Sequence, residues 1–455
     1  MSARTRVAAG AARTAGSLSR LARRGGGTTI PGHVFNRLAP GGLRELAAEL
    51  PDGVVAISAT NGKTTTAAML AHILSADRTV CRNASGANLL SGIASTLVAI
   101  PTGAAVGVLE VDEAALPAVA TAAAPRAIVL GNLFRDQLDR HGELEMVADR
   151  WRAMTAALDP DAVLVVCADD PVVDALVDGR TAIRFGIDDP AAALPGLDAA
   201  ADSTFCVRCG APYAYDAVYL GHLGAYRCPN GDHARGPLDV AARDVRPHGV
   251  DGIAFRVDAP GGSADVRLAL PGLYNVENAL GAIAAAHVLG VPVAVSAERL
   301  ATFSAAFGRF EHVAVEGREA VLVLFKNPTG ANEALRAVAP GVAGAQVVLA
   351  LNDRVADGRD VSWIWDIDIE GRLDAAVVTC AGRRNADMAL RLRYAGIPVE
   401  AISRHADVED AFDNAVRAAA PGERVFVLAT YTAMLELHRA LSDRGLTAPF
   451  WEEAR

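Results

Sequence analysis

Ala59-Thr60-Asn61-Gly62-Lys63-Thr64-Thr65-Thr66 is the stretch that decides the fold of this chain. It follows the apolar residues 54–57, which predict a buried strand, and precedes the alanine-rich residues 67–74, which predict a helix. A strand, a Gly-Lys-Thr turn and a helix are together typical of a phosphate-binding loop. There the N–H groups at the helix N-terminus hold phosphate, and the threonine hydroxyl reaches Mg²⁺. The expected nucleotide-binding residues are Thr60, Asn61, Gly62, Lys63, Thr64 and Thr65, with Thr64 also a magnesium ligand.

The use of lysine supports this interpretation. The chain has 43 Lys plus Arg, but lysine occurs only at Lys63 and Lys326. A compact ammonium fits a tight phosphate cradle, whereas the wide guanidinium fork of arginine does not. One departure keeps an alternative open, because Ile57 stands where the full loop pattern has a glycine. The alternative is a helix cap followed by a polar turn, and we expect instead that the loop binds ATP or a close relative.

Length and composition bound the fold class and the environment. A chain of 455 residues can form two or three domains, and its 51% hydrophobic content with alternating apolar and alanine-rich segments predicts an α/β protein. The net charge of −10 argues against general binding of nucleic acid. Six cysteines in a chain of this size do not make a disulfide scaffold, so a reducing cytoplasm fits best. No stretch is long and apolar enough to cross a bilayer.

Four segments can be distinguished along the chain. Residues 1–42 form a basic arm that we expect to be flexible. Residues 1–44 contain no acidic residue, and six arginines lie within the first 24 positions: Arg4, Arg6, Arg13, Arg20, Arg23 and Arg24. An arm near anionic lipid at the inner face of the membrane, a solvated tail and a transit peptide are the alternatives. Residues 43–305 read as a doubly wound ATP-binding domain with a Cys-rich insert at 203–237, and residues 306–455 read as a second α/β domain after a hinge at 303–309.

Polar residues follow several of the expected strands of the first domain. Glu110 is the first candidate for a second magnesium ligand and Glu113 the second candidate, because ligands gather at the carboxyl ends of parallel strands. The run 131–142 (Gly-Asn-Leu-Phe-Arg-Asp-Gln-Leu-Asp-Arg-His-Gly) is typical of an active-site loop. Asn275 and Asn278 open a long alanine-rich helix, where Asn275 could also be only a cap.

The insert has the spacing of a zinc knuckle. Cys206 and Cys209 form a Cys-x-x-Cys-Gly motif, whose turn points two thiolates at one tetrahedral metal, and Cys228 supplies a third. Gly231 stands where a fourth cysteine is expected, so His233 is a doubtful fourth ligand beside Asp232 or water. We expect Zn²⁺ here, with a metal-free loop as the alternative.

The second domain contains its own cluster of polar residues. Lys326 lies after a strand, and Asp353, Asp357 and Asp360 fall in glycine-containing turns. These aspartates are candidates for facing a partner or guiding ammonium, although Asp-Gly turns need such residues for structural reasons alone.

The ordered motifs of the first domain resemble the Mur ligase superfamily, the ATP-dependent enzymes that build the cell-wall stem peptide. The matching residues are the loop at Lys63, Glu110, the 131–142 run, Asn275 with Asn278, and Arg309. The resemblance implies that Lys63 and Thr64 hold phosphate and Mg²⁺, that an asparagine at the start of the helix touches adenine, and that Arg309 meets the nucleotide across the hinge.

The polar runs of the second domain and the cysteine insert narrow the resemblance to the MurT family within that superfamily, and two departures from the usual ligases agree with this. The metal-binding histidine of the usual ligases is Gln137 here, and no lysine exists between Lys63 and Lys326 to carry the carbamate that those ligases commonly use. Too few residues precede the ATP-binding domain to form a UDP-binding domain. The resemblance implies ATP-driven amidation of the α-carboxylate of D-glutamate in lipid II, with ammonia from a separate GatD-type glutaminase subunit.

Two rival functions follow from the same residues. The first is a stand-alone amino-acid ligase of the Mur or folylpolyglutamate type, against which Gln137 and the missing lysine count. The second is a non-catalytic scaffold that binds ATP and zinc, or a nucleic-acid regulator, against which the acidic balance counts.

Overall fold

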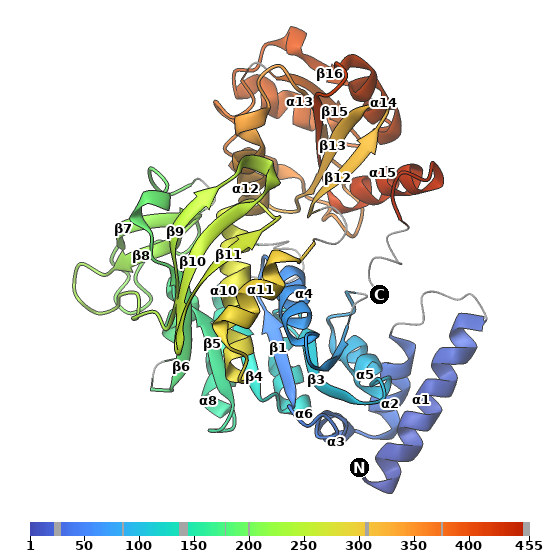
Figure 1. The fold of residues 1–455 in the computed structure, drawn as a ribbon, viewed down its shortest axis with the longest axis vertical. Helices are drawn as coiled ribbons and strands as arrows, with labels where there is room; N and C mark the ends of the chain where they lie inside the picture. The colour runs from blue at the N-terminus through green and yellow to red at the C-terminus, as the bar shows by residue number, and fades with distance from the viewer. Residues whose placement is uncertain are drawn as a thin grey trace.

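The computed structural model describes residues 1–21, 29–83, 86–135, 144–177, 179–198, 201–304, 309–374 and 376–448, without the side chains of Arg20, Leu21 and Arg309. It has two α/β units, each with its own central sheet, and a small two-stranded sheet beside the first (Figure 1). The predicted α/β class with a phosphate-loop domain and a second α/β domain is confirmed. The boundary predicted at residue 305 stays a prediction, because residues 305–308 lie outside the described residues.

The first unit is built on a nine-stranded sheet in the order β11-β10-β9-β6-β5-β4-β1-β3-β2. In this sheet order, all neighbouring strands between β2 at one edge and β9 pair in parallel. From β9 the sheet continues through β10 to β11 as an antiparallel meander. The strands are β1 (Val54–Ser58), β2 (Thr79–Arg82), β3 (Ala104–Glu110), β4 (Ala127–Leu130), β5 (Val163–Cys167), β6 (Ala182–Ile187), β9 (Val240–Pro247), β10 (Ile253–Ala259) and β11 (Gly262–Leu268).

Helices cover both faces of this sheet because alternate strand residues point to opposite sides. In β1, Val55 and Ile57 join the core beneath α4, α10 and α11, whereas Val54 and Ala56 join the core on the other face. The helices of the first face are α4 (Lys63–Leu74), α10 (Leu273–Val288) and α11 (Val293–Ala301). The helices of the second face are α3 (Gly42–Ala47), α5 (Leu90–Val98), α6 (Leu116–Ala123) and α8 (Leu144–Ala157). A short helix, α9 (Pro171–Asp174), follows β5. The continuous apolar strands of the sequence are explained by this two-sided burial.

The second unit has a six-stranded sheet in the order β12-β13-β17-β14-β15-β16, in which only β12 and β13 pair antiparallel. One face is covered by α12 and α13 and the other by α14 and α15. The elements are β12 (Arg309–Val315), β13 (Arg318–Leu324), α12 (Pro328–Val338), β14 (Gln346–Ala350), β15 (Val377–Ala381), α13 (Asn385–Tyr394), β16 (Ile402–Arg404), α14 (Val408–Ala418), β17 (Arg424–Ala429) and α15 (Tyr431–Asp443), with a 3₁₀ helix η5 (Ser362–Asp366) before β15.

The N-terminal arm differs from the prediction of a flexible segment. Residues 3–21 form the helix α1 (Ala3–Leu21), which packs on α2 (Ile30–Leu38) and α5. Ala8, Ala9 and Ala12 are buried against these helices, and the Arg13 Nε donates to the Val98 carbonyl at 2.8 Å. The prediction was wrong for these residues because small side chains, rather than large apolar ones, form the buried face of the helix.

The Cys-rich insert contains the antiparallel pair β7 (Ala214–Leu220) and β8 (Leu223–Arg227). Its own small core consists of Cys206, Tyr213, Tyr226 and Cys228. The strands of the insert lie beside the nine-stranded sheet (Figure 1), and their residues Ala217, Tyr219 and Leu223 join the core beneath α10.

Candidate active site

The predicted phosphate loop leaves the carboxyl end of β1 and enters α4 at Lys63. Gly62 has a φ of 90°, and a Cβ there would lie 1.9 Å from Oδ1 of Asn278, so only glycine fits the turn. The loop is tied to the end of β4, because Asn61 N–H donates to Asn132 Oδ1 at 2.9 Å and Asn132 Nδ2 donates to the Asn61 carbonyl at 3.1 Å. These bonds hold the loop open at the helix N-terminus, where Thr64 is exposed.

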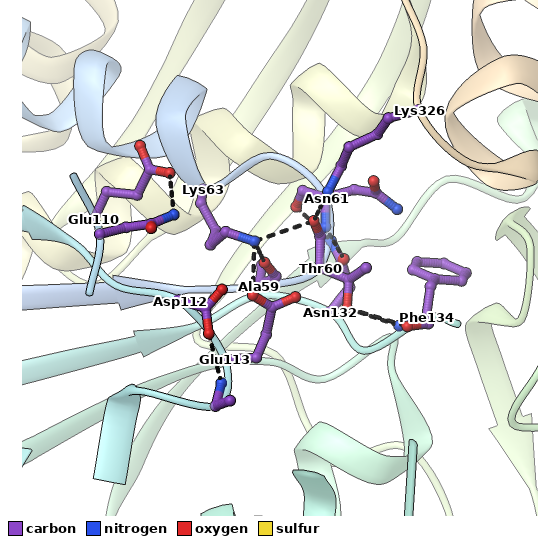
Figure 2. Close-up of polar contacts among 12 residues, drawn as sticks. Ala59, Thr60, Asn61, Lys63, Glu110, Asp112, Glu113, Asn132, Phe134 and Lys326 are labelled. Carbon is purple, nitrogen blue, oxygen red and sulfur yellow. Dashed lines mark hydrogen bonds and ion pairs between the residues drawn. The ribbon is translucent and has the colours of Figure 1, made fainter. Parts of the chain in front are cut away.

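Lys63 lies across its own loop (Figure 2). Its Nζ donates to the carbonyls of Ala59 and Thr60 and forms an ion pair with Glu113 at 2.8 Å. Both charged side chains are largely buried, with 11% and 8% of their surface exposed. A lysine whose partners are weak carbonyl acceptors and one carboxylate can exchange those carbonyls for phosphate oxygens with a small movement of its stem.

Three acidic residues follow one another at the end of β3: Glu110, Asp112 and Glu113 (Figure 2). Glu110 is buried, and its Oε1 accepts from the Asn88 amide at 3.3 Å. Glu113 is held by its backbone, since the buried Trp151 indole donates to the Glu113 carbonyl at 2.9 Å. The structure thus puts the second candidate, Glu113, directly against Lys63. Which of the two glutamates would hold Mg²⁺ stays a proposal.

The charge of Glu113 is controlled by its surroundings. Burial raises the pKa of this carboxyl. Lys63 and then Lys326 lower the pKa by more than burial raises it, so the pKa ends below its ordinary value. Glu113 is therefore ionised at neutral pH and balances the two lysines of the chain.

Asn275 and Asn278 are buried at the start of α10 and connect this helix to the loop. Thr66 donates to Asn278 Oδ1 at 3.2 Å, Asn278 Nδ2 donates to Asn275 Oδ1 at 3.1 Å, and Asn275 Nδ2 donates to the Pro271 carbonyl at 2.7 Å. Gly272 rather than Asn275 caps the helix, so the alternative that Asn275 is only a cap is wrong. A direct contact of either amide with adenine stays a proposal.

Sequence reasoning missed Glu277, which lies between these two asparagines. It lines a small cavity under the loop together with Ser58, Asn61 and Asn132. Glu277 Oε1, Ser58 Oγ and Asn61 Nδ2 are buried and make no hydrogen bond within the described part of the chain. Burial, and then the neighbouring Asp169, raise the pKa of Glu277 well above its ordinary value. The signal in the sequence was a single acid in an otherwise alanine-rich helix.

The second domain contributes two residues to the loop. Lys326 Nζ donates to the Thr60 carbonyl at 3.3 Å, and Asn327 Nδ2 donates to Asn61 Oδ1 at 2.9 Å (Figure 2 shows Lys326 above the loop). Both lysines of the chain therefore bond to the same carbonyl, although 263 positions separate them in the sequence. The rarity of lysine was the only sign of this contact in the sequence.

Three aspartates predicted for catalysis or partner contact are bonded within the second domain. Asp357 is buried and accepts from the Thr432 backbone at 2.7 Å and from its hydroxyl. Asp353 pairs with Arg383 at 2.8 Å, and Asp360 accepts from the Ser362 N–H at 2.8 Å at the start of η5. These bonds give Asp357 a structural task, whereas Asp360 is exposed on the surface. A role of any of them toward a partner stays a proposal.

Two further predictions cannot be placed. Residues 136–142 of the predicted active-site run lie outside the described residues, and so does the side chain of Arg309, although its backbone begins β12.

The insert brings the three predicted thiols together. The sulfur atoms of Cys206, Cys209 and Cys228 lie within 4.8 Å of one another, close enough to bind one metal ion. His233 lies outside this cluster, and its Nδ1 is 2.6 Å from the Tyr213 hydroxyl, so its role as a fourth ligand stays a prediction. The His233 ring packs against Tyr213 and Tyr226 of the insert core.

Two protein-family models match this chain. The Mur ligase middle domain model matches residues 57–208, and the model described as MurT ligase C-terminal matches residues 324–434.

Curated relatives match nearly the whole length of the chain. It is 31% identical over 436 residues to the lipid II isoglutaminyl synthase (glutamine-hydrolyzing) subunit MurT of Streptococcus pneumoniae, which covers 94% of this chain and 95% of that one. It is 32% identical over 404 residues to the subunit of the same name from Staphylococcus aureus, with coverages of 86% and 89%. Among solved structures, a MurF ligase of Thermotoga maritima in complex with ADP is similar in fold, with a TM-score of 0.63, 17% identity and coverages of 89% and 83%.

Proposed function

This chain belongs to the MurT family of lipid II isoglutaminyl synthase subunits, and we propose on that ground that it is the ATP-dependent carbon–nitrogen ligase of such an enzyme. Its reaction is the amidation of the α-carboxylate of D-glutamate in the stem peptide of lipid II, with glutamine as the source of the nitrogen. The observation that carries the proposal is the meeting of Lys63 and Lys326, from two domains, at one phosphate loop.

The first step activates the carboxylate. A carboxylate oxygen attacks the γ-phosphorus of ATP, the bond from that phosphorus to the β–γ bridging oxygen breaks, and ADP leaves. The product is an acyl phosphate. Lys63 serves this step by offsetting the negative charge that develops on the phosphate oxygens, and Lys326 does so from the opposite side of the loop. The N–H groups of α4 hold the phosphates at the positive end of the helix.

The second step forms the amide. Ammonia attacks the acyl carbon, loses a proton, and expels inorganic phosphate as the carbon–oxygen bond breaks. The nitrogen must be supplied by another polypeptide, because the cysteines outside the insert are unsuited to glutamine hydrolysis. Burial raises the pKa of Cys81 to about 11 and that of Cys380 to about 12, and Cys167 is fully buried beside Glu277. We propose a GatD-type glutaminase subunit as this partner.

Magnesium fits the residues present at the loop. Thr64 offers an exposed hydroxyl at the helix start, and Glu110 and Glu113 offer carboxylates at the end of the neighbouring strand. Oxygen ligands of this kind suit Mg²⁺, which would neutralise phosphate charge when bound with ATP.

Zinc fits the three thiols of the insert, and the fourth position would then be taken by His233, Asp232 or a solvent molecule. Metal analysis of the purified chain tests this: one equivalent of zinc is expected, falling when Cys206 is changed to serine. A Cys206→Ser chain with unchanged metal content would contradict the site. A cobalt-substituted chain whose visible spectrum changes in Asp232→Asn would identify the carboxylate as the fourth ligand.

We place the reaction at the inner face of the cytoplasmic membrane, because the proposed substrate is anchored there by its lipid. No helix in the described ranges is long and apolar enough to cross a membrane.

Mass spectrometry tests the function directly. Lipid II is incubated with ATP, ammonium and the purified chain, and the stem peptide is then examined for replacement of one carboxyl hydroxyl by an amino group. Amidation by the wild type and none by Lys63→Ala is the expected result. Turnover of ATP with free amino acids, and none with ammonium and lipid II, would favour the stand-alone ligase instead.

A further inference from the structure

The helix α1 has one side that is exposed and apolar. Val7 and Leu18 have 72% and 61% of their surface exposed, and they lie eleven residues apart, which is about three turns of helix. They therefore share one side of α1, together with the exposed Ala11 and Thr14. The opposite side, which includes Ala12, is buried against the protein.

Exposed apolar side chains are concentrated in this part of the molecule. Of the eighteen large apolar residues that are exposed in the described ranges, five fall within the first 38 positions: Met1, Val7, Leu18, Ile30 and Leu38. Single exposed apolar residues are ordinary, but a group on two packed helices marks a surface that contacts something else.

The same surface is basic, although the whole chain has a net charge of −10. Residues 1–44 contain no Asp or Glu. Helical geometry puts Arg4 on one side of Val7 and Arg6 and Arg13 on the other, and all three side chains are exposed. Arg4 is oriented by its bond to the Leu38 carbonyl at 2.8 Å, which ties the basic residues of α1 to the end of α2.

This surface lies on the active-site domain. α1 packs on α5, and Asn88, just before α5, donates its amide to Glu110 in the candidate site. Leu89, between Asn88 and α5, is 55% exposed. Figure 1 shows α1 and α2 at the end of the molecule opposite the second domain.

We propose that the exposed face of α1 and α2 docks on an anionic phospholipid bilayer; this rests on the proposed function, whose substrate is lipid-linked. Val7 and Leu18 enter the boundary between headgroups and acyl chains, and the arginines beside them meet lipid phosphates. A row of apolar side chains flanked by cations is the arrangement that binds at a membrane interface. A nucleic acid would need the cations but not the apolar row, so the two together favour lipid.

Vesicle sedimentation with the full chain tests the proposal. The probes are vesicles of phosphatidylcholine alone and vesicles that also contain phosphatidylglycerol, in buffers of low and high salt. We expect binding to the anionic vesicles only, weakened by salt, and reduced about tenfold or more in a Val7→Asp, Leu18→Asp double variant. Leu390→Asp, which changes an exposed leucine of the second domain, is the matched control and should bind like the wild type.

Three results would overturn the proposal: no preference for anionic vesicles, equal binding by the double variant, or an equal loss in Leu390→Asp. Because Val7 and Leu18 are exposed, the double variant should unfold at the wild-type temperature. If it does not fold, Arg6→Gln is combined with Arg37→Gln, which changes an exposed arginine in the last turn of α2, and this pair should weaken binding several-fold. Amidation of lipid II in detergent separates the two proposals, since it should be unchanged in these variants and would fail only if the proposed function is wrong.

Discussion

The two domains contain the same local arrangement, a strand followed by a lysine-containing loop and a helix, but only in the first do we propose a phosphate site. In the first domain β1 leads through Lys63 into α4, and in the second β13 leads through Lys326 into α12. The N-terminus of α4 begins at Gly62 without a side-chain cap. The N-terminus of α12 is capped by Asn327, whose Oδ1 accepts from Gly330 at 2.8 Å, and begins with Pro328, which has no N–H.

The comparison shows that a capped N-terminus leaves fewer N–H groups for an anion than an uncapped one. The capped loop has its own task, because it delivers Lys326 and Asn327 to the uncapped one. One domain thus supplies the cradle, and the other supplies a second cation to it.

Removal of the two lysines should give the largest difference between the domains. Lys63→Ala is expected to lower kcat for ammonium-dependent amidation about 1000-fold, because a cation directed at the transferring phosphate is lost. Lys326→Ala should lower it about 10- to 100-fold, because this lysine reaches the loop from outside. Steady-state kinetics measures both values. Equal losses would show that the two loops share the work evenly.

Glycine substitutions test the cradle itself. Gly62→Ala should weaken ATP binding about 100-fold, since its Cβ would meet Asn278 Oδ1 and its φ is positive. Gly330→Ala in the second loop is the matched control, because its Cβ would come only within 3.1 Å of Asn327 Oδ1. Calorimetric titration with ATP distinguishes them, and a tolerated Gly62→Ala would mean that the loop does not bind phosphate.

The charge of Glu113 predicts a pH dependence of stability. Burial raises the pKa of Glu113, but Lys63 and Lys326 leave it lowered in the folded state. A carboxyl whose pKa is lowered in the folded state stabilises the protein at pH values above its pKa in the unfolded state. This stabilisation is lost as the pH falls through the pKa of the folded state. The free energy of unfolding should therefore fall by about 1–3 kcal/mol in Glu113→Gln at pH 7, and the difference should shrink below about pH 4.

Urea unfolding at several pH values measures this difference. Asp353→Asn in the second domain, where a half-buried carboxyl pairs with the exposed Arg383, should change the stability much less. A constant difference between wild type and Glu113→Gln from pH 7 to pH 3 would contradict the ion pair.

Two substitutions of Asn327 distinguish its capping of α12 from its contact with the first domain. Asn327→Ala should lower the free energy of unfolding by about 1 kcal/mol, because α12 loses its cap. Asn327→Asp keeps an oxygen for the Gly330 N–H but cannot donate to Asn61, so it should retain stability and lose activity several-fold. Thermal unfolding and the amidation assay together test this, and equal stability loss in both variants would refute the capping role.

The sequence predicted the phosphate loop, the main strands and the α/β class because these depend on local patterns of apolar, glycine and lysine residues. It did not predict α1, since the buried face of that helix is made of alanines that look the same as solvent-exposed ones. It put Glu110 before Glu113 as a magnesium ligand, and that order stays a prediction. It did not predict that Glu113 contacts Lys63, which depends on the path of the chain after β3 and on Trp151, whose indole bonds to the Glu113 carbonyl. The contact of Lys326 with the first domain depends on how two domains pack, which no local pattern encodes.

A double-mutant cycle on Lys63 and Lys326 tests the central claim, that both cations act on one phosphate group, most directly. The measured quantity is kcat/KM for ATP in the ammonium-dependent amidation, in wild type, Lys63→Ala, Lys326→Ala and the double variant. Because both ammonium groups interact with the same phosphate charge, the fold-loss of kcat/KM in the double variant should be at least tenfold smaller than the product of the fold-losses in the two single variants. Losses that multiply without coupling would show that the lysines act at separate places, and would contradict the account.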